Sequence, residues 1–98
     1  MARPQKYYKE EILTHALALS EVVGYQNVTR DAVAERSGTS ASLISKLFGT
    51  MIQFKRAIMS AAVVRGNLVV LAQGLAAGDS KARAADAKMK RASVEALL

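Results

Sequence analysis

Residues 29–48 read TRDAVAERSGTSASLISKLF and predict two short helices separated by a glycine turn. Thr29 is placed to cap the first helix, because its hydroxyl can accept a hydrogen bond from the opening turn. Gly38 can adopt the positive φ with which helices commonly end. Thr39 and Ser40 follow and can cap the second helix, whose apolar residues fall on one side. This pattern is typical of the helix-turn-helix motif, whose second helix enters the major groove of DNA.

The composition agrees with a nucleic-acid partner. The 98-residue chain has 14 Lys and Arg against 8 Asp and Glu, which gives a formal net charge of +6. A basic excess favours polyanionic partners because each neutralised phosphate releases counterions, although many small basic proteins bind no charged partner. The chain has no cysteine and one histidine, so we expect no cofactor, no metal site and no enzyme activity. The N-terminus carries no secretory signal, and we expect a cytoplasmic protein.

Helical periodicity elsewhere makes the predicted fold class all-α. A first helix is predicted over residues 6–23, a long fourth helix over 51–75 and a basic, alanine-rich last helix over 80–97. No strand-like alternation is present. We expect residues 1–56 to form a three-helix, homeodomain-like helix-turn-helix head. Residues 57–98 are expected to form a helical dimerisation segment that packs with the head as one domain.

A series of positions between about residues 10 and 58 follows a familiar spacing: Gly24-Tyr25, Thr29, Val33-Ala34, Gly38, Ser40, Ile44, Phe48 and Phe54. This spacing resembles the N-terminal DNA-binding domain of the TetR family of transcriptional regulators. The resemblance implies a TetR-like head that binds operator DNA. Ser45 and Met51 stand where that family usually has a tyrosine and a lysine that contact the DNA backbone. Nearby cations must then supply part of the phosphate contact.

The predicted DNA-contacting residues follow from their positions in the motif. Those at the helix starts and on the outward side of the second helix are Thr29, Arg30, Thr39, Ser40, Ala41, Ser42, Ser45 and Lys46; nearby phosphate contacts are Lys55 and Arg56, and Arg3 and Lys6 lie on an N-terminal arm. Most of these side chains are short, so readout would rest on hydroxyl hydrogen bonds and methyl contacts. Ordinary capping explains Ser40 equally well, and loose charged termini are common. The basic residues of the last helix are expected to be a solvated face away from DNA.

Residues 57–75 are apolar around most of the predicted helix, and such a helix must be covered on most sides. A second copy is the natural cover, so we expect a homodimer on a palindromic operator with half-sites about 34–36 Å apart or a multiple of it. The predicted dimer contacts are Ala62, Val63, Gly66, Val69, Val70 and Leu75. A membrane span is the competing interpretation, but Arg65 and Asn67 lie at its centre, and we expect no membrane partner.

The residues after Arg56 are too few to enclose a ligand pocket of roughly several hundred Å³. The expected function is therefore a transcriptional repressor without a small-molecule inducer, regulated by its own concentration or by a partner protein. The alternative is a protein-interaction module on the same fold, such as an anti-repressor or an assembly factor that has lost DNA binding.

Overall fold

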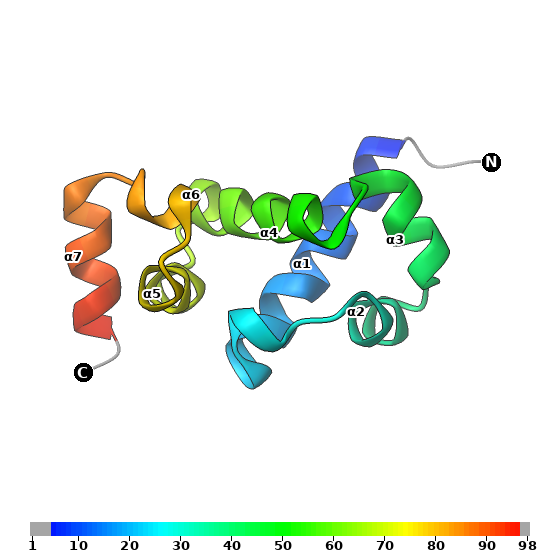
Figure 1. The fold of residues 1–98 in the computed structure, drawn as a ribbon, viewed down its shortest axis with the longest axis horizontal. Helices are drawn as coiled ribbons and strands as arrows, with labels where there is room; N and C mark the ends of the chain where they lie inside the picture. The colour runs from blue at the N-terminus through cyan, green and yellow to red at the C-terminus, as the bar shows by residue number, and fades with distance from the viewer. Residues whose placement is uncertain (1–4, 97–98) are drawn as a thin grey trace.

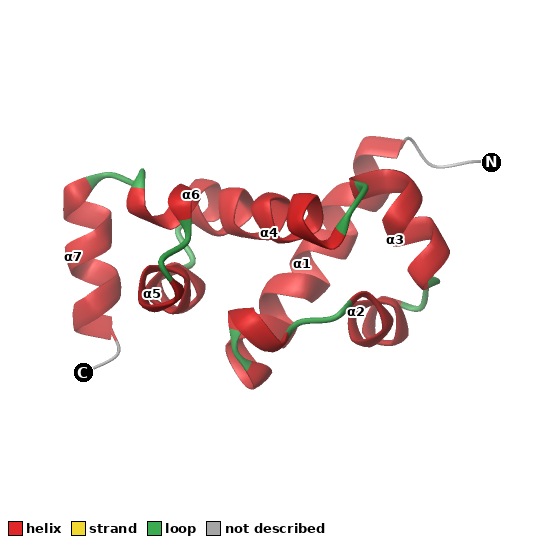
Figure 2. Ribbon diagram, viewed as in Figure 1, coloured by secondary structure: helices red, strands yellow, loops and turns green. Residues whose placement is uncertain are grey.

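The structure is a computed structural model that describes residues 5–96, with side chains from Tyr8 on. Its regular structure is helical throughout these residues, which confirms the all-α prediction (Figures 1 and 2). The elements in chain order are α1 (Gln5–Val23), the 3-10 turn η1 (Tyr25–Asn27), α2 (Arg30–Ser37), α3 (Ala41–Phe48), α4 (Met51–Arg65), α5 (Leu68–Ala77), α6 (Ser80–Arg83) and α7 (Ala87–Ala96). The molecule is elongated, with α3 and α7 at opposite ends (Figure 1).

The predicted limits of α2 and α3 are confirmed, and the expected caps form. The hydroxyl oxygen of Thr29 accepts a hydrogen bond from the Ala32 N–H at 3.2 Å, and Ser40 does the same for Leu43 at 3.1 Å. Gly38 ends α2 with φ 71° and ψ 28°, in the left-handed region where glycine avoids a Cβ clash. The chain therefore leaves one helix and enters the next within three residues.

The prediction of one long helix over residues 51–75 is wrong. α4 ends at Arg65, Gly66 adopts φ 72° and ψ 31°, and α5 begins at Leu68. The side-chain oxygen of Asn67 caps α5 by accepting from the Val70 N–H at 3.0 Å. A glycine followed by a capping amide thus ends one helix and starts another, although the apolar residues continue across the break.

The predicted last helix is also two helices. α6 is a single turn, and Asp79 caps it by accepting from the N–H groups of Lys81 and Ala82 at 2.9 and 3.0 Å. The side chain of Asp86 then accepts from the Lys88 N–H at 3.2 Å at the start of α7. Between them Ala85 is buried against the core, so the chain turns there to bring α7 alongside α5.

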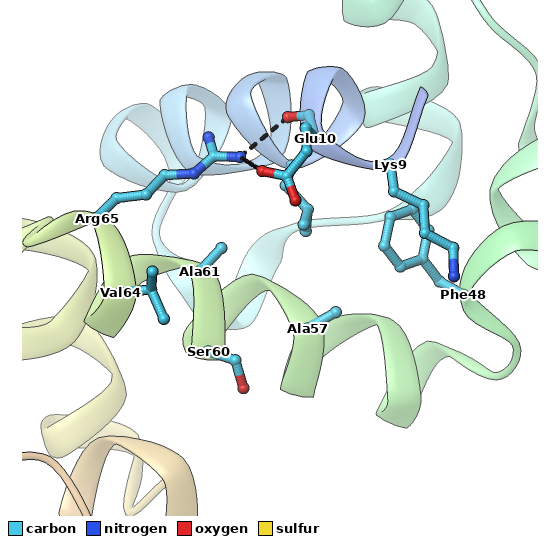
Figure 3. A pocket seen from close by; sticks show the side chains of 9 residues that line it. Lys9, Glu10, Phe48, Ala57, Ser60, Ala61, Val64 and Arg65 are labelled. Atoms are coloured by element: carbon cyan, nitrogen blue, oxygen red, sulfur yellow. Dashed lines mark hydrogen bonds and ion pairs between the residues drawn. The ribbon is translucent and has the colours of Figure 1, made fainter. Parts of the chain in front are cut away.

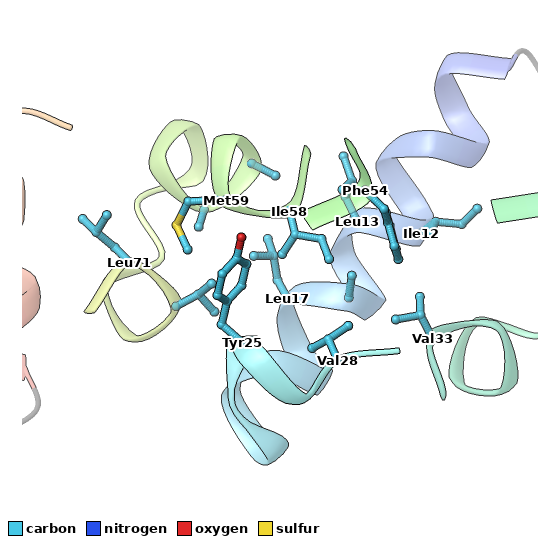
Figure 4. Close-up of a cluster of buried hydrophobic side chains, with 14 of the residues drawn as sticks. Ile12, Leu13, Leu17, Tyr25, Val28, Val33, Phe54, Ile58, Met59 and Leu71 are labelled. Atoms are coloured by element: carbon cyan, nitrogen blue, oxygen red, sulfur yellow. The ribbon is translucent and has the colours of Figure 1, made fainter. Parts of the chain in front are cut away.

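The hydrophobic core runs through the middle of the molecule and is built mainly by α1, α2, α4 and α5, with Tyr25 from η1 (Figure 4). Its largest fully buried apolar side chains are Phe54, Ile12, Ile44, Ile58, Met59, Leu71, Val33 and Val70. α4 contributes three of them. The expected boundary after residue 56 falls inside α4, so the two halves of the chain share this helix and its core residues.

Among the described residues, no single helix is long and apolar enough to cross a membrane. Within the same described residues, α3 and α4 taken together are long and apolar enough, but they are bent by 76° at the break between them.

Candidate nucleic-acid interface

α3 buries one side and exposes the side on which DNA contacts were predicted. Ile44 is fully buried, whereas Ser42 and Lys46 are exposed and Ala41 and Ser45 are half-buried. The apolar side of α3 packs against α1, α2 and α4. Its polar side is therefore free to meet a ligand.

Several predicted contact residues gather in one polar cleft between the start of α2 and the start of α3. Its lining residues are Arg30, Asp31, Ala41, Ser42 and Ser45, and its volume is about 600 Å³. An Arg30 guanidinium N–H donates a hydrogen bond to the Ser45 hydroxyl, which joins the two helices across the cleft.

Asp31 is a cleft residue that the sequence analysis missed. It lines the same cleft as Arg30 and is exposed. A carboxylate repels phosphate but can accept a hydrogen bond from a cytosine amino group. The signal was available, because Asp31 directly follows Arg30 in the first turn of α2.

The hydroxyls of Thr29, Thr39 and Ser40 are partly engaged by the protein itself. Thr29 and Ser40 accept from backbone N–H groups as helix caps. Thr39 lies 2.8 Å from the Ser37 hydroxyl oxygen, at the end of α2. A hydroxyl that only accepts still has a hydrogen to donate, so Thr29 and Ser40 can cap a helix and donate to a phosphate at the same time.

Lys55 and Arg56 do not line the cleft. The Lys55 ammonium donates to the backbone oxygen of Gln26 at 3.0 Å and lies 5.7 Å from the centroid of the Tyr25 ring. Lys55 therefore holds η1 against α4. Arg56 is exposed and lines a depression of about 300 Å³ beside the same ring. Arg3 and the side chain of Lys6 lie outside the described residues.

Tyr25 connects the α1–α3 region to the C-terminal helices. Its hydroxyl oxygen lies 2.8 Å from Asp79 Oδ2 and 3.1 Å from the backbone oxygen of Lys55, and its N–H donates to Gln73 Oε1 at 2.9 Å. Burial, together with the Asp79 carboxylate, raises the pKa of the Tyr25 phenol above its usual range. No local sequence pattern indicates these contacts, because Tyr25 and Asp79 are 54 positions apart.

The predicted dimer contacts divide into two groups. Ala62 and Val70 are fully buried by the chain's own helices, so a partner cannot reach them in this structure, and we remove them from the predicted surface. Val63, Val69 and Leu75 are half-buried, and Gly66 is exposed. The physical reason is that α5 and α6 pack on α4 and α7 packs along α5, so the chain's own helices supply the cover that was expected from a second copy.

A shallow groove between α1 and α4 is the second feature of the surface (Figure 3). Arg65 lies at one end, where its guanidinium contacts the Glu10 carboxylate at 2.8 Å and the Thr14 hydroxyl at 2.7 Å. Val64 on the groove wall is 86% exposed, which is the highest exposure of a large apolar side chain in the part of the chain that the structure describes. The groove therefore exposes apolar surface next to a fixed ion pair.

The charge of the chain is distributed unevenly between its two halves. Residues 5–49, which contain α1 to α3, have five Lys and Arg and five Asp and Glu, so their formal net charge is zero. Residues 50–98 have eight Lys and Arg against three Asp and Glu. The basic excess that suggested a nucleic-acid partner therefore lies mostly outside the α2–α3 region. Counting charge by segment would have shown this from the sequence.

No protein-family model, curated protein or solved structure matches this chain. The TetR resemblance therefore stays a prediction. Within residues 5–96, no group of three or more His, Asp or Glu side chains is placed to hold a metal ion.

Proposed function

We propose that this chain is a sequence-specific DNA-binding repressor that acts as a homodimer on a palindromic operator, without a small-molecule inducer. The observation that carries the proposal is the polar cleft between α2 and α3. Its lining residues come from the two helices of a predicted helix-turn-helix, and α3 exposes hydroxyl and lysine side chains beside it. In that motif the second helix reads base edges in the major groove.

The contacts suggest a division of roles within the proposed interface. Arg30 is held at the Ser45 hydroxyl, so its guanidinium is already placed over the outward side of α3. Ser42 is exposed next to it and can exchange hydrogen bonds with a base edge. Thr29 and Ser40 can donate to phosphates from the helix starts, and Lys46 adds a cation on the same helix. In a TetR-like arrangement these contacts would set the register on DNA.

The proposed dimer uses the exposed face of α4 rather than the buried residues of α5. Val63 and Val64 line a depression of about 250 Å³ next to α6, and Val64 also lines the groove against α1. Burying an exposed valine side chain contributes about 1.5–3 kcal/mol. A symmetric contact would bury this face on both protomers.

The test is a genomic selection for bound DNA, followed by footprinting of the recovered sites. We expect a palindromic site, with affinity reduced at least tenfold by Lys46→Ala and by Arg30→Ala. Arg36→Ala removes one cation from the exposed end of α2 outside the cleft, and as the matched control it should change affinity less than threefold. Binding that is indifferent to sequence, or equally sensitive to all three substitutions, would refute the proposal.

One observation favours the second candidate, a protein-interaction module that has lost specific DNA binding. The α1–α3 region has no net charge, whereas DNA-binding surfaces are usually strongly positive. If the selection recovers no site, the same α2–α3 surface would be tested for protein partners by cross-linking from Ser42→Cys.

A further inference from the structure

A group of exposed basic residues lies on α6 and α7, at the end of the molecule opposite α3. It consists of Lys81, Arg83, Lys88 and Arg91 on α6 and α7, all of them exposed, and we call it the basic end. α7 lies at the far left of Figure 1 and α3 at the far right. Residues 80–96 contain five Lys and Arg against two Asp and Glu.

The charges of the basic end are free to meet an external anion. No ion pair within residues 5–96 engages any of its four cations. Asp79 and Asp86 accept hydrogen bonds from backbone N–H groups as helix caps, and Glu95, about one turn after Arg91 on α7, is exposed and forms no ion pair among the described residues. Lys90 differs from the four, since its ammonium donates to the backbone oxygen of Arg83 at 2.9 Å and fixes the turn between α6 and α7.

The apolar side of α7 is already covered, which decides what kind of anion fits. Met89 packs against the hydrophobic core, Ser93 is fully buried, and α7 lies along α5. A helix that binds a lipid surface needs a free apolar face to insert between the headgroups. α7 exposes Val94 alone among its large apolar side chains, so a phosphate backbone fits this surface better than a membrane does.

The placement of α3 determines whether one DNA duplex can contact both α3 and the basic end. The buried side of α3 packs against α1, α2 and α4, and α1 and α4 lie between α3 and α7 (Figure 1). Its exposed residues Ser42 and Lys46 are therefore separated from the basic end by α1 and α4. A duplex bound at α3 leaves the basic end free.

We propose that the basic end binds the sugar-phosphate backbone of a second DNA duplex, so that the protein bridges two duplexes. The bridging rests on the proposed function, because α3 must hold the first duplex. Backbone contacts of this kind are independent of sequence and weaken steeply with salt. The inference contradicts our sequence-based expectation that these residues form only a solvated face.

The test measures capture of a fluorescent duplex by protein bound to a second duplex on beads. Lys88→Gln with Arg91→Gln removes two cations from the basic end and keeps good helix formers. Val22→Glu with Gln26→Glu is the matched control, since it lowers the net charge by the same two units at exposed positions on α1 and η1. Binding of a single duplex is measured separately for each variant.

We expect the basic-end variant to reduce capture at least tenfold, while the control variant captures like the wild type. Loss of two phosphate contacts should also lower the salt slope of capture by about 1.8. Capture unchanged in the basic-end variant would overturn the inference, because the α3 surfaces of a dimer would then suffice. Equal loss in both variants would overturn it too, since net charge alone would explain the result.

Two further outcomes separate this inference from the proposed function and from a membrane role. If Lys46→Ala and Arg30→Ala leave duplex binding intact but the basic-end variant abolishes it, the proposed function fails and DNA binding by the basic end stands. If duplex binding depends on Lys46 but no second duplex is captured, the inference alone fails. Binding to phosphatidylserine vesicles that requires Lys88 and Arg91, without capture of DNA, would overturn the inference in favour of a membrane.

Discussion

The turns at Gly38 and Gly66 have nearly the same backbone but join very different pairs of helices. Their φ and ψ angles are 71° and 28° in the first and 72° and 31° in the second. The residue after each glycine donates its N–H to a carbonyl five residues earlier, at 2.9 and 2.8 Å. A polar side chain then caps the next helix, Ser40 in one case and Asn67 in the other.

The helices that follow the two turns differ in what they expose. α3 exposes Ser42 and Lys46, whereas α5 buries Val70 and Leu71 beneath neighbouring helices. A helix, a glycine turn and a second helix are therefore not enough to indicate a DNA-binding motif. The outward side of the second helix makes the distinction, and in the α2–α3 pair this side borders a polar cleft.

The largest effect is expected where the second helices differ most. Leu71→Ala should lower the free energy of unfolding by about 3 kcal/mol, because it removes a fully buried side chain from the core. Ser42→Ala should change it by less than about 0.5 kcal/mol, as is usual at an exposed site. Urea denaturation measures both. A loss below about 1 kcal/mol for Leu71→Ala would mean that α5 is not a core helix.

Similar turns should respond similarly to substitution. Gly38→Ala and Gly66→Ala should each cost about 1–2 kcal/mol, because alanine is strained at these positive φ values. An added Cβ meets no atom within 4 Å at either position, so the cost is one of backbone conformation alone. Unfolding free energies that differ by more than about 1 kcal/mol between the two variants would break the comparison.

The contact between the two regions should be visible in the pH dependence of stability. The folded state keeps Tyr25 protonated because its pKa is raised by burial and by Asp79. The unfolded phenol ionises near pH 10, so stability is retained below that pH and falls above it, by about 1.4 kcal/mol at pH 11. Comparison with Tyr25→Phe isolates this contribution from the titration of lysines. If the free energies of unfolding of the wild type and Tyr25→Phe changed in parallel with pH, the predicted contribution of Tyr25 would be contradicted.

The smallest effect is expected from the caps. Ser40→Ala and Asn67→Ala each remove one side-chain acceptor and should cost about 1 kcal/mol in thermal or urea unfolding. If the proposed function is correct, Ser40→Ala should also weaken DNA binding, while Asn67→Ala leaves it unchanged. Equal effects on DNA binding would remove the functional difference between the two turns.

The sequence predicted the first three helices well because their ends carry strong local signals. Thr29, Gly38 and Ser40 supply caps and a left-handed turn that operate without help from the rest of the chain. A glycine with a capping residue is also present at Gly66-Asn67, and a capping residue is present at Asp86. Our prediction gave more weight to the continuous apolar or alanine-rich sequence around them. Giving the local capping signals more weight would have placed both breaks.

The candidate site was predicted only in part. Position in the motif identified Arg30, Ser42 and Ser45, which the structure brings together in the cleft. It did not indicate that Lys55 would contact Gln26 or that Ala62 would be buried by helices folded back later in the chain. Such contacts depend on the path of the chain from α5 to α7, and that path depends on the positions at which one helix ends and the next begins.

The sharing of α4 between the two halves limits how this protein can be divided or recombined. The ring centroids of Phe54 and of Phe48 in α3 lie 4.9 Å apart. Further along α4, the Met59 side chain packs against Gly74 of α5. A fragment that ends at residue 56 would keep the first contact and lose the partners of α1 that lie beyond it. A new α1–α3 region could thus be exchanged into this chain only together with α4, so the smallest unit of modular exchange extends to Arg65.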